Sequence, residues 1–455
     1  MDSRVIILGA GVTGLSLSWR LGILGVKTIV LESSGIIGGL AGTLREDGYC
    51  MDFGPHSFFS EDTEILDTVL KLFDNTLTPR PRRVKFYYQG RFLDYPLTPH
   101  GVLFQMGFWP GVRAALSFIK SKIKPRARVP IEDETVEDWA IGSFGEHLYR
   151  TFFKPYTEQF WKVSCTELSS RSIPTHTRMS FINTCRLLLQ QRQAKINPSI
   201  IEREMLPTYY PDSGFGEIPE QIANAVKDTG GQIYSECRAI GVSKLPDARV
   251  RVKYEYKGEQ REIEGSHVVS TIPLNQFVKM INPSAPPKVL ESAERLDYRS
   301  LMVLGMVTEK KDILNCSYIY VLNRPYNRIA EMNEFNPTTS HVGENIIMVE
   351  IPCLMDSAAW TAPKEQIFDM CIGSLAEDGF LQPGDVKRLI IIRAPNAYPI
   401  YRKGYAAHLK RLLDYIDAQD GLSTLGRTGE FMYMDIDECM RKAFNFADFL
   451  QNKHS

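Results

Sequence analysis

The sequence predicts an α/β fold in which a parallel sheet with flanking helices is combined with a helical subdomain and an antiparallel sheet. Three observations lead to this fold class. An apolar run at residues 4–8 is followed at once by closely spaced glycines and a helical pattern, and a second apolar run follows at residues 27–31. The second half of the chain holds several short β-branched or alternating runs. With 455 residues and no Pro/Gly/Ser-rich linker, the chain is expected to form two or three interwoven subdomains.

The first strand and helix carry a GxGxxG motif at Gly9, Gly11 and Gly14. Gly9 is expected to make the tight turn, Gly11 to let the backbone approach a pyrophosphate, and Gly14 to permit close packing of the helix on the strand. The second strand ends in Glu32, whose carboxylate is placed to accept hydrogen bonds from both ribose hydroxyls of an adenosine. The unit therefore predicts a Rossmann-like site for a dinucleotide without a 2′-phosphate.

A second glycine-rich turn follows at Gly38 and Gly39 and continues through Leu40 and Ala41. At this distance from Glu32, the turn resembles the extended flavin-binding signature of the amine oxidase and protoporphyrinogen oxidase superfamily. The resemblance implies that the cofactor is FAD and that Gly38, Gly39 and Ala41 contribute to its site. Leu40 stands where the family usually has an arginine, which implies the loss of one phosphate or ribose contact.

His56 belongs to the stretch GPHSFF, residues 54–59, which follows a short strand expected at residues 51–53. Members of the superfamily bring such a loop to the isoalloxazine ring of the flavin. His56 is therefore expected to face the flavin and to act as a catalytic residue, and the alternative is that it caps the turn.

The C-terminal part adds a second cofactor-binding segment. Residues 422–425 predict a strand, Gly426 and Arg427 a turn, and residues 435–450 an amphipathic helix with Asp435 as its N-cap. A helix N-terminus directed at the flavin would stabilise negative charge on the reduced ring. Gly426, Arg427 and Asp435 are therefore expected to take part in cofactor binding.

The predicted organisation interleaves cofactor-binding and substrate-binding segments. The FAD-binding domain is expected to comprise residues 1–99, 206–248 and 401–455, with residues 268–275 returning to it. Residues 100–205 are expected to form a helical substrate or lid subdomain, and residues 249–400 a mainly antiparallel sheet. The sheet is predicted from the runs at residues 249–256, 302–307, 318–322 and 346–351.

An apolar stretch at residues 103–123 has two interpretations. A buried helical layer is favoured, and an exposed patch for lipid or a partner is the alternative.

Several stretches spread over nearly the whole chain indicate one branch of the superfamily. They are GEHLY at 145–149, YTEQFW at 156–161, EL at 167–168, RSIP at 171–174, LDYRSL at 296–301, PYNRIAE at 325–331, YP at 398–399, GR at 426–427 and YMD at 433–435. Together they resemble the motifs of the UDP-galactopyranose mutases, flavoenzymes that interconvert the pyranose and furanose forms of a nucleotide sugar.

The resemblance implies a reaction in which N5 of the reduced flavin attacks the anomeric carbon while the nucleotide diphosphate leaves. The sugar ring then opens and recloses on another hydroxyl. Arg328 and Arg171 would stabilise the departing diphosphate, and Tyr398 and Tyr433 would hold its oxygens. The flavin must first be reduced, so an external donor such as NAD(P)H is implied.

The same resemblance implies further substrate contacts through Tyr156, Trp161 and Tyr326. Trp161 is expected either to stack on the nucleotide base from a lid or to anchor the helix that contains Tyr156. Each tyrosine taken singly fits a core position equally well, and the company of Arg328 favours a ligand-binding role.

Two positions depart from the mutase pattern. Phe59 stands where that family has a second histidine, and Thr175 stands where it has a second loop arginine. These departures keep open a second hypothesis, an oxidoreductase of the amine oxidase or protoporphyrinogen oxidase type that transfers hydride to the flavin. An aromatic content of 11% and the apolar stretch at residues 103–123 fit a hydrophobic substrate funnel. Arg328 with its tyrosines discriminates between the two, because a neutral apolar substrate would not require it.

Composition excludes several other classes of function. The formal net charge is -1, so nucleic acid is not an expected partner. The eight cysteines are scattered and form no CxxC pair, which predicts a location in the reducing cytoplasm. The sequence contains no run of about 18 apolar residues, so no membrane span is predicted. The histidines show no metal-ligand spacing, and no GxSxG elbow is present. We therefore expect a cytoplasmic enzyme with a small-molecule substrate, and its oligomeric state stays open.

Overall fold

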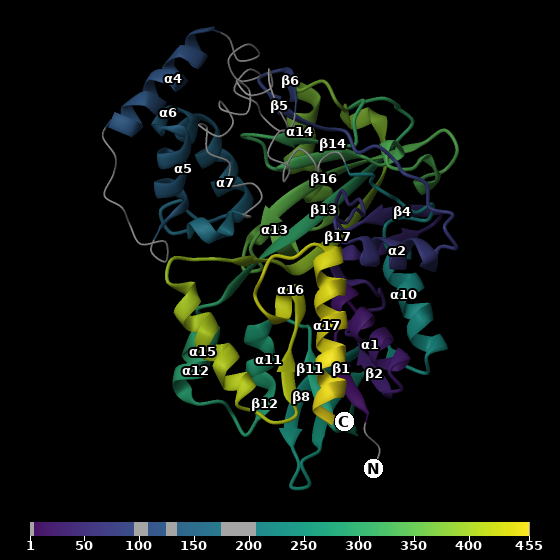
Figure 1. Ribbon diagram of the computed structural model, residues 1–455. Helices are drawn as coiled ribbons and strands as arrows, with labels where there is room; N and C mark the ends of the chain where they lie inside the picture. The colour runs from purple at the N-terminus through teal and green to yellow at the C-terminus, as the bar shows by residue number, and fades with distance from the viewer. Residues whose placement is uncertain (1–3, 95–107, 124–133, 174–205, 455) are drawn as a thin grey trace.

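The computed structural model describes residues 4–94, 108–123, 134–173 and 206–454. A five-stranded parallel sheet and a seven-stranded, mainly antiparallel sheet form the two halves of the molecule, and a group of helices lies beside the second sheet (Figure 1). The fold is therefore mixed α/β, as the sequence predicts.

The parallel sheet is assembled from stretches that lie far apart in the sequence. In spatial order its strands are β18 (Leu422–Thr424), β11 (His267–Ser270), β1 (Val5–Leu8), β2 (Thr28–Leu31) and β7 (Gln232–Tyr234). The central strand β1 places Ile6 between Ile29 and Val268. The strands predicted at residues 4–8, 27–31 and 422–425 are confirmed to within one residue at each end, and the chain returns to this sheet at β11.

Helices cover both faces of the parallel sheet, because successive residues of a strand point to opposite sides. Val5 and Ile7 pack in one core with α1 (Val12–Ile23), α10 (Glu217–Asp228) and α17 (Ile436–His454). Ile6 and Leu8 pack in a second core with α11 (Leu274–Met280), α12 (Pro287–Glu294) and α15 (Tyr405–Asp417). The C-terminal helix α17 therefore belongs to the same layer as the first helix of the chain.

Next to the parallel sheet lies a four-stranded sheet. Its strands are β10 (Glu259–Gly265), β9 (Val250–Tyr256), β8 (Cys237–Lys244) and β12 (Ile281–Asn282). The prediction that residues 249–256 join the antiparallel substrate sheet is therefore wrong. Short turns connect β8, β9 and β10, so these strands pair with one another, and Val250 and Val252 are buried in the core of the cofactor half.

The large sheet forms the other half of the molecule. In spatial order it contains β17 (Val386–Ile400), β13 (Asp297–Thr308), β16 (Asn345–Cys353), β15 (Arg328–Glu331), β14 (Tyr318–Val321), β5 (Val84–Tyr88) and β6 (Arg91–Asp94). The strands predicted at residues 302–307, 318–322 and 346–351 are confirmed. Helices α13 (Ala358–Thr361) and α14 (Lys364–Glu377) pack against this sheet.

β5 and β6 require a correction to the predicted organisation. Both strands fall inside the segment 1–99 that the sequence assigns to the cofactor domain. They lie instead at the edge of the large sheet, because β5 pairs in parallel with β14. The loop at residues 54–59 therefore leads from the cofactor half towards the substrate half.

Shorter elements complete the described chain. The hairpin of β3 (Thr43–Glu46) and β4 (Tyr49–Asp52), helix α2 (Thr63–Leu72) and helix α16 (Gly426–Gly429) lie near the boundary of the two halves. Single helical turns are η1 (Gly39–Ala41), η3 (Ser170–Ser172), η5 (Met332–Glu334), η6 (Pro337–Thr339) and η7 (Pro383–Asp385).

The helical group consists of α4 (Phe108–Ile123), α5 (Val136–Phe144), α6 (Glu146–Leu148), the π-helical turn η2 (Tyr149–Phe153) and α7 (Lys154–Trp161). The favoured interpretation of residues 103–123 as a buried layer needs correction. Leu116, Ile119 and Ile123 are 62%, 52% and 73% exposed on one face of α4. Residues 103–107 lie outside the described residues.

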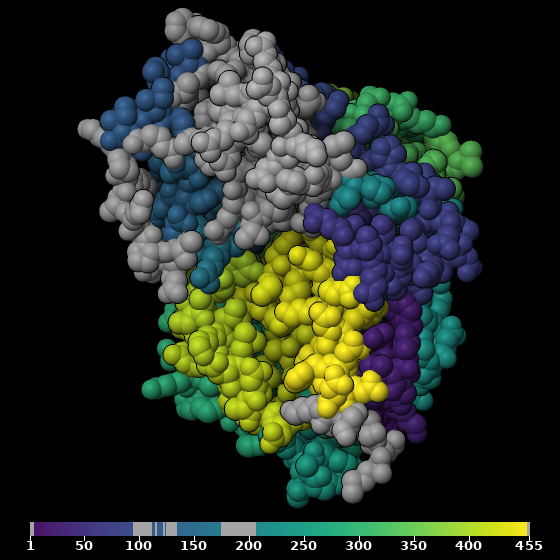
Figure 2. Space-filling view, viewed as in Figure 1, coloured from purple at the N-terminus to yellow at the C-terminus, as the bar shows by residue number. Residues whose placement is uncertain are grey.

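In the lower half of the face shown in Figure 2, the surface is formed mainly by C-terminal segments. There α15 and α17 lie at the surface beside the N-terminal helix α1. Within the described ranges, every helix is too short or too polar to cross a lipid bilayer.

Candidate functional site

The first glycine turn joins β1 to α1 and is packed tightly on two sides. Gly9 has a φ of +100°, and a Cβ there would lie 2.6 Å from Oγ1 of Thr271. A Cβ at Gly14 would lie 2.1 Å from the carbonyl oxygen of Gly9. At Gly11, by contrast, a Cβ would meet no described atom within 4 Å. The turn therefore leaves open space beside the N-terminus of α1, where backbone N–H groups favour an anion.

The second glycine turn is hydrogen-bonded to the first. Gly38 and Gly39 have φ values of +99° and +58°, and the N–H of Gly38 donates to the carbonyl oxygen of Ala10 at 2.8 Å. The N–H of Ala10 in turn donates to Oε2 of Glu32 at 2.8 Å. Both glycine turns and the acidic residue after β2 are therefore held in one rigid arrangement.

A cavity of about 1540 Å³ begins at these turns and extends to the large sheet and α7. This volume exceeds the roughly 300–1,000 Å³ of a pocket for one small ligand. It therefore has room for a dinucleotide with a substrate beside it. The predicted residues that line it are Gly9, Gly11, Glu32, Gly38, Gly39, Ala41, His56, Tyr156, Trp161, Arg328, Tyr398, Arg427, Tyr433 and Asp435.

The end of the cavity at the parallel sheet fits FAD. Gly11 leaves the approach to the positive end of α1 free, and Glu32 offers its carboxylate at the carboxyl edge of β2. The pyrophosphate would be held beside Gly11 and Gly38, and the adenosine ribose beside Glu32.

His56 lies on the cavity wall between the two halves of the molecule. Its ring stacks on Phe215 at 5.1 Å between centroids, and its Nδ1 is buried without a hydrogen-bond partner. Burial, and then the nearby cations Arg328 and Arg427, lower the pKa of His56 to about 3. The imidazole is therefore neutral at physiological pH.

Arg328 enters the cavity wall from β15 as half of a buried ion pair. Its partner is Glu350, the residue directly opposite on β16. Nε of Arg328 donates to Oε2 of Glu350, and Nη2 donates to Oε1 at 2.7 Å. The carboxylate holds the pKa of Arg328 well above its usual value despite burial. Since the pair uses two nitrogens, Nη1 is the guanidinium nitrogen that remains for a ligand.

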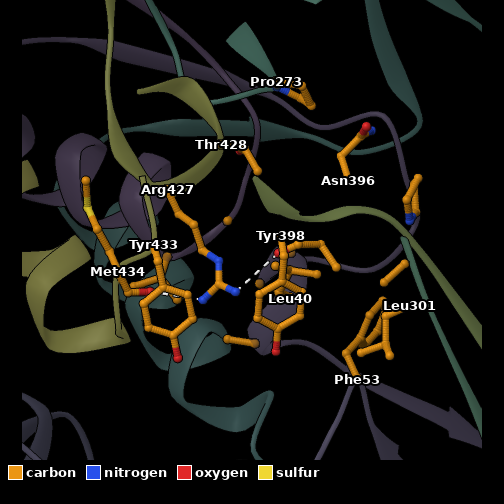
Figure 3. A pocket seen from close by; sticks show the side chains of 18 of the residues that line it. Leu40, Phe53, Pro273, Leu301, Asn396, Tyr398, Arg427, Thr428, Tyr433 and Met434 are labelled. Atoms are coloured by element: carbon orange, nitrogen blue, oxygen red, sulfur yellow. Dashed lines mark hydrogen bonds between the residues drawn. The ribbon is translucent and has the colours of Figure 1, made fainter. Parts of the chain in front are cut away.

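Arg427 lies between the rings of Tyr398 and Tyr433, as Figure 3 shows. Its Cζ is 4.6 Å from the centroid of Tyr398 and 4.4 Å from that of Tyr433, and the two rings are nearly parallel at 17°. The guanidinium donates to the carbonyl oxygens of Met434 (3.1 Å) and Ala397 (3.2 Å). These acceptors are neutral carbonyls, and the carboxylate of Asp435 on the same wall attracts the guanidinium without a hydrogen bond between these two described residues, so Arg427 keeps N–H groups and charge for a ligand.

Helix α7 forms the wall opposite the parallel sheet. Tyr156 and Trp161 both line the cavity, and Trp161 is only 8% exposed. The indole packs edge to face against Phe160 (5.1 Å) and Tyr398 (6.3 Å). Trp161 therefore anchors α7 and also lines the cavity, so the two interpretations of this residue are compatible.

Four predicted site residues do not line the cavity, for three different reasons. Tyr326 is fully buried in the core of the large sheet, which corrects its predicted role in substrate binding. Arg171 is exposed on η3, and only its neighbours Ser172 and Ile173 reach the wall, so its predicted contact with the diphosphate is corrected as well. Gly14 and Gly426 serve packing, since a Cβ at Gly426 would lie 2.5 Å from Oγ1 of Thr13.

The two departures from the mutase pattern differ in what the structure shows. Phe59 lines the cavity, with the guanidinium of Arg82 5.4 Å from its ring. A cation therefore does approach the position of the missing histidine. Thr175 lies outside the described residues.

Sequence reasoning missed Glu350, Arg393 and Arg299. Arg393 lines the cavity and donates to the carbonyl oxygens of Trp360 and Ala362. Arg299 is fully buried behind Tyr398. Glu350 and Arg299 lie in stretches that read as ordinary strands, and only the motif around Arg299 gave any signal in the sequence.

Positive charge predominates on the described wall of the cavity. The five cationic residues are Arg82, Arg238, Arg328, Arg393 and Arg427. The two carboxylates are Glu32 and Asp435. Arg328 and Arg238 are paired with Glu350 and Glu255, whereas Arg393 and Arg427 donate to backbone carbonyls. The last two arginines therefore favour an anionic ligand.

Comparison with known proteins agrees with this architecture. A family model described as flavin containing amine oxidoreductase matches residues 12–385. The chain is 22% identical over 455 residues to a probable UDP-galactopyranose mutase of Klebsiella pneumoniae, with 98% of this chain and 94% of the relative covered.

Two solved structures share the whole fold. Reduced UDP-galactopyranose mutase superposes with a TM-score of 0.81 at 19% identity, covering 99% of this chain and 96% of the other. A putative protoporphyrinogen oxidase from Exiguobacterium sp. 255-15 gives a TM-score of 0.77 at 16% identity, covering 100% and 99%. At these identities the likeness establishes the fold, and the reaction has to be argued from the site.

Proposed function

The chain belongs to the family of flavin-containing amine oxidoreductases, and from that premise we propose that this FAD-dependent enzyme acts on a nucleotide sugar. The proposed chemistry is like that of UDP-galactopyranose mutase, to which the chain is similar over nearly its full length. The scattered cysteines support the cytoplasm as the proposed location.

One observation carries the proposal: Arg427 lies in the wall at the substrate end of the cavity and is hydrogen-bonded to backbone carbonyls rather than to a carboxylate. Glu350 balances Arg328, but Arg427 is bonded only to carbonyls and lies between two tyrosine rings. A diphosphate bears two negative charges and accepts several hydrogen bonds, so it matches this set of donors. Tyr398 and Tyr433 add phenol hydroxyls on the same wall.

The chain's own residues would bind and orient the substrate. Arg328 and Arg427 would bind the diphosphate as it leaves the anomeric carbon, and Tyr398 and Tyr433 would hold its oxygens. The neutral His56 can accept or donate one hydrogen bond without adding charge to the cavity. When bound and reduced, the flavin would supply the nucleophilic nitrogen for the anomeric carbon. An external donor such as NAD(P)H is proposed as the reductant.

The second candidate is an oxidoreductase that transfers hydride from its substrate to the flavin. Its support is the apolar part of the cavity wall, which includes Phe53, Phe59 and Phe86, and the similarity to a putative protoporphyrinogen oxidase. This candidate leaves the excess of cations without a role unless its substrate is acidic.

The test is a titration of the FAD-loaded enzyme with UDP-, dTDP- and GDP-sugars, in the oxidised and the dithionite-reduced states, followed by tryptophan fluorescence. We expect one nucleotide sugar to quench the emission, more strongly in the reduced state. The double variant Arg328→Met/Glu350→Gln removes both charges together, so that no unpaired charge stays buried. It should keep FAD and bind the nucleotide sugar about 10- to 100-fold more weakly.

A matched control is Arg324→Met/Asp378→Asn. It also removes a bidentate ion pair, but one that does not line the cavity. It should bind the nucleotide sugar like the wild type. If no nucleotide sugar changes the emission, and the flavin oxidises amines or porphyrinogens with oxygen, the second candidate replaces the first.

A further inference from the structure

Arg299 is a buried cation to which the proposed reaction assigns no role. It lies on β13, is fully buried, and does not line the cavity. Nη1 donates to the carbonyl oxygen of Phe160 at 3.2 Å, whereas Nε and Nη2 have no hydrogen-bond partner among the described residues. Burial lowers the pKa of Arg299 to about 10, so the guanidinium stays protonated at neutral pH. Glu350 attracts this charge and Arg328 repels it, but no carboxylate is hydrogen-bonded to Arg299 among the described residues. A buried charge of this kind is costly and therefore needs another source of stabilisation.

Two aromatic rings supply that stabilisation. Cζ of Arg299 lies 4.1 Å from the ring centroid of Phe160 and 4.2 Å from that of Tyr398. The two rings stand at 73° to each other with centroids 5.3 Å apart, so the guanidinium occupies the corner between them. Both distances are within the range of cation–π attraction, which is strongest where water is excluded.

These contacts join two separate elements of the cavity wall. Tyr398 is the residue opposite Arg299 on the neighbouring strand β17, and the strand register shifts directly after this pair. Phe160 lies in the last turn of α7, where unsatisfied carbonyls carry partial negative charge. One side chain therefore binds a strand residue and the end of the helix that carries Tyr156 and Trp161.

We propose that Arg299 is a positioning residue that fixes the distance between Tyr398 and the last turn of α7, and so sets the width of the substrate end of the cavity. The inference rests on the proposed function, in which Tyr398, Tyr156 and Trp161 contact the substrate. Arginine suits this role because its planar guanidinium can face two rings and still donate to a carbonyl. A lysine ammonium is a compact, strongly hydrated charge and cannot make all three contacts.

The first test compares Arg299→Lys with the wild-type holoenzyme, using the nucleotide sugar that the wild type converts. The KM is expected to rise about 10- to 30-fold, because this change corresponds to the loss of one desolvated cation–π contact. The kcat should fall less than the KM rises, and the FAD content should not change. Arg324→Lys, in a pair that does not line the cavity, should leave the KM unchanged. A KM of Arg299→Lys within about twofold of the wild type would overturn the proposal.

The second test needs no substrate and therefore separates this inference from the proposed function. Hydrogen exchange of the holoenzyme should become about 10-fold faster at the amides of residues 158–162 in Arg299→Lys, while the β1–α1 turn is unchanged. Arg299→Met should show the same pattern, because it also lacks the planar cation. If exchange at the end of α7 is unaltered in both variants, Arg299 does not hold the helix. If the wild type binds no nucleotide sugar but exchange does change, the proposed function fails and the positioning role stands.

Discussion

At the scale of single residues, Asp52 shows how burial changes a carboxylate that does not line the cofactor cavity. It ends β4, is 1% exposed, and accepts hydrogen bonds from Oγ1 of Thr43 (2.5 Å), the hydroxyl of Tyr210 (2.7 Å) and the N–H of Phe215 (3.1 Å). Burial raises the pKa of Asp52 from 3.8 to about 6, and these hydrogen bonds oppose the shift. Because Phe215 stacks on His56, the site depends on this buried carboxylate indirectly.

A raised pKa in the folded state means that folding favours the protonated acid. The stability contributed at Asp52 is then fully present below pH 4 and is lost as the pH rises through 6. Between pH 5 and pH 7.5 the free energy of unfolding should fall by about 1 to 2 kcal/mol on account of this residue. Asp52→Asn keeps the acceptor for Thr43 and Phe215 and can donate to Tyr210, so it should lack this decrease.

The measurement for Asp52 is urea unfolding of the wild type and Asp52→Asn at both pH values. Only the difference between the two proteins isolates the residue, because other groups also titrate. A pH dependence that is equal in both proteins would show that Asp52 is already ionised at pH 5.

Residue-level prediction succeeded where the signal is local and failed where it depends on distant contacts. The glycines and Glu32 were predictable because their spacing along the chain determines the turn they form. Glu350, Arg299 and Asp52 acquire their roles from partners that adjacent sequence does not reveal. Tyr326 illustrates the opposite error: it precedes β15, where the alternation of a strand does not apply, and its side chain lies in the core although its residue type and its closeness to Arg328 in the sequence suggested a ligand contact.

At the scale of elements, the β1–α1 turn separates the packing role of a glycine from its binding role. At Gly14 a side chain would collide with the carbonyl of Gly9, whereas at Gly11 there is space and a φ of -72° that alanine adopts readily. Gly11→Ala should therefore change the stability of the apoprotein by less than about 1 kcal/mol. It should nevertheless weaken FAD binding at least about 10-fold, because the methyl group occupies the approach to the positive end of α1.

Urea unfolding of the apoprotein and FAD titration measure the two effects separately. Gly14→Ala should lose both stability and FAD. Gly373→Ala in α14 is the control, since its Cβ also meets no described atom within 4 Å and it does not line the cavity. If Gly11→Ala binds FAD as tightly as the wild type, the phosphates of FAD do not bind at this turn.

Strands and helices were predictable as elements but less so in their pairing. β9 has the alternating pattern expected of a strand, yet pattern alone does not say which sheet a strand joins, and short turns to β8 and β10 decided it. In α4 the apolar content indicated burial, but Leu116, Ile119 and Ile123 are exposed on one face. Hydrophobicity predicts a helix face without identifying what covers it.

At the scale of the whole molecule, the cavity exists only when distant parts of the chain are assembled. The five strands of the parallel sheet come from residues 5–31, 232–234, 267–270 and 422–424, and α17 packs on α1 from the other end of the sequence. The large sheet and α7 then close the substrate end. This interleaving was predictable in outline because the glycine turn and the C-terminal GR motif both point to one cofactor.

A ligand held by segments from both ends of the chain should stabilise the entire fold. FAD bound only by the native state raises the free energy of unfolding by about 2.7 kcal/mol at a free concentration 100 times its dissociation constant. The Tm of the apoprotein should therefore keep rising with added FAD after the site is saturated. Glu32→Gln, which weakens the expected ribose contact, should need a higher FAD concentration for the same rise. A Tm that does not respond to FAD, measured by the loss of far-UV circular dichroism, would contradict binding in this cavity, because a native-state ligand cannot bind without shifting the unfolding equilibrium.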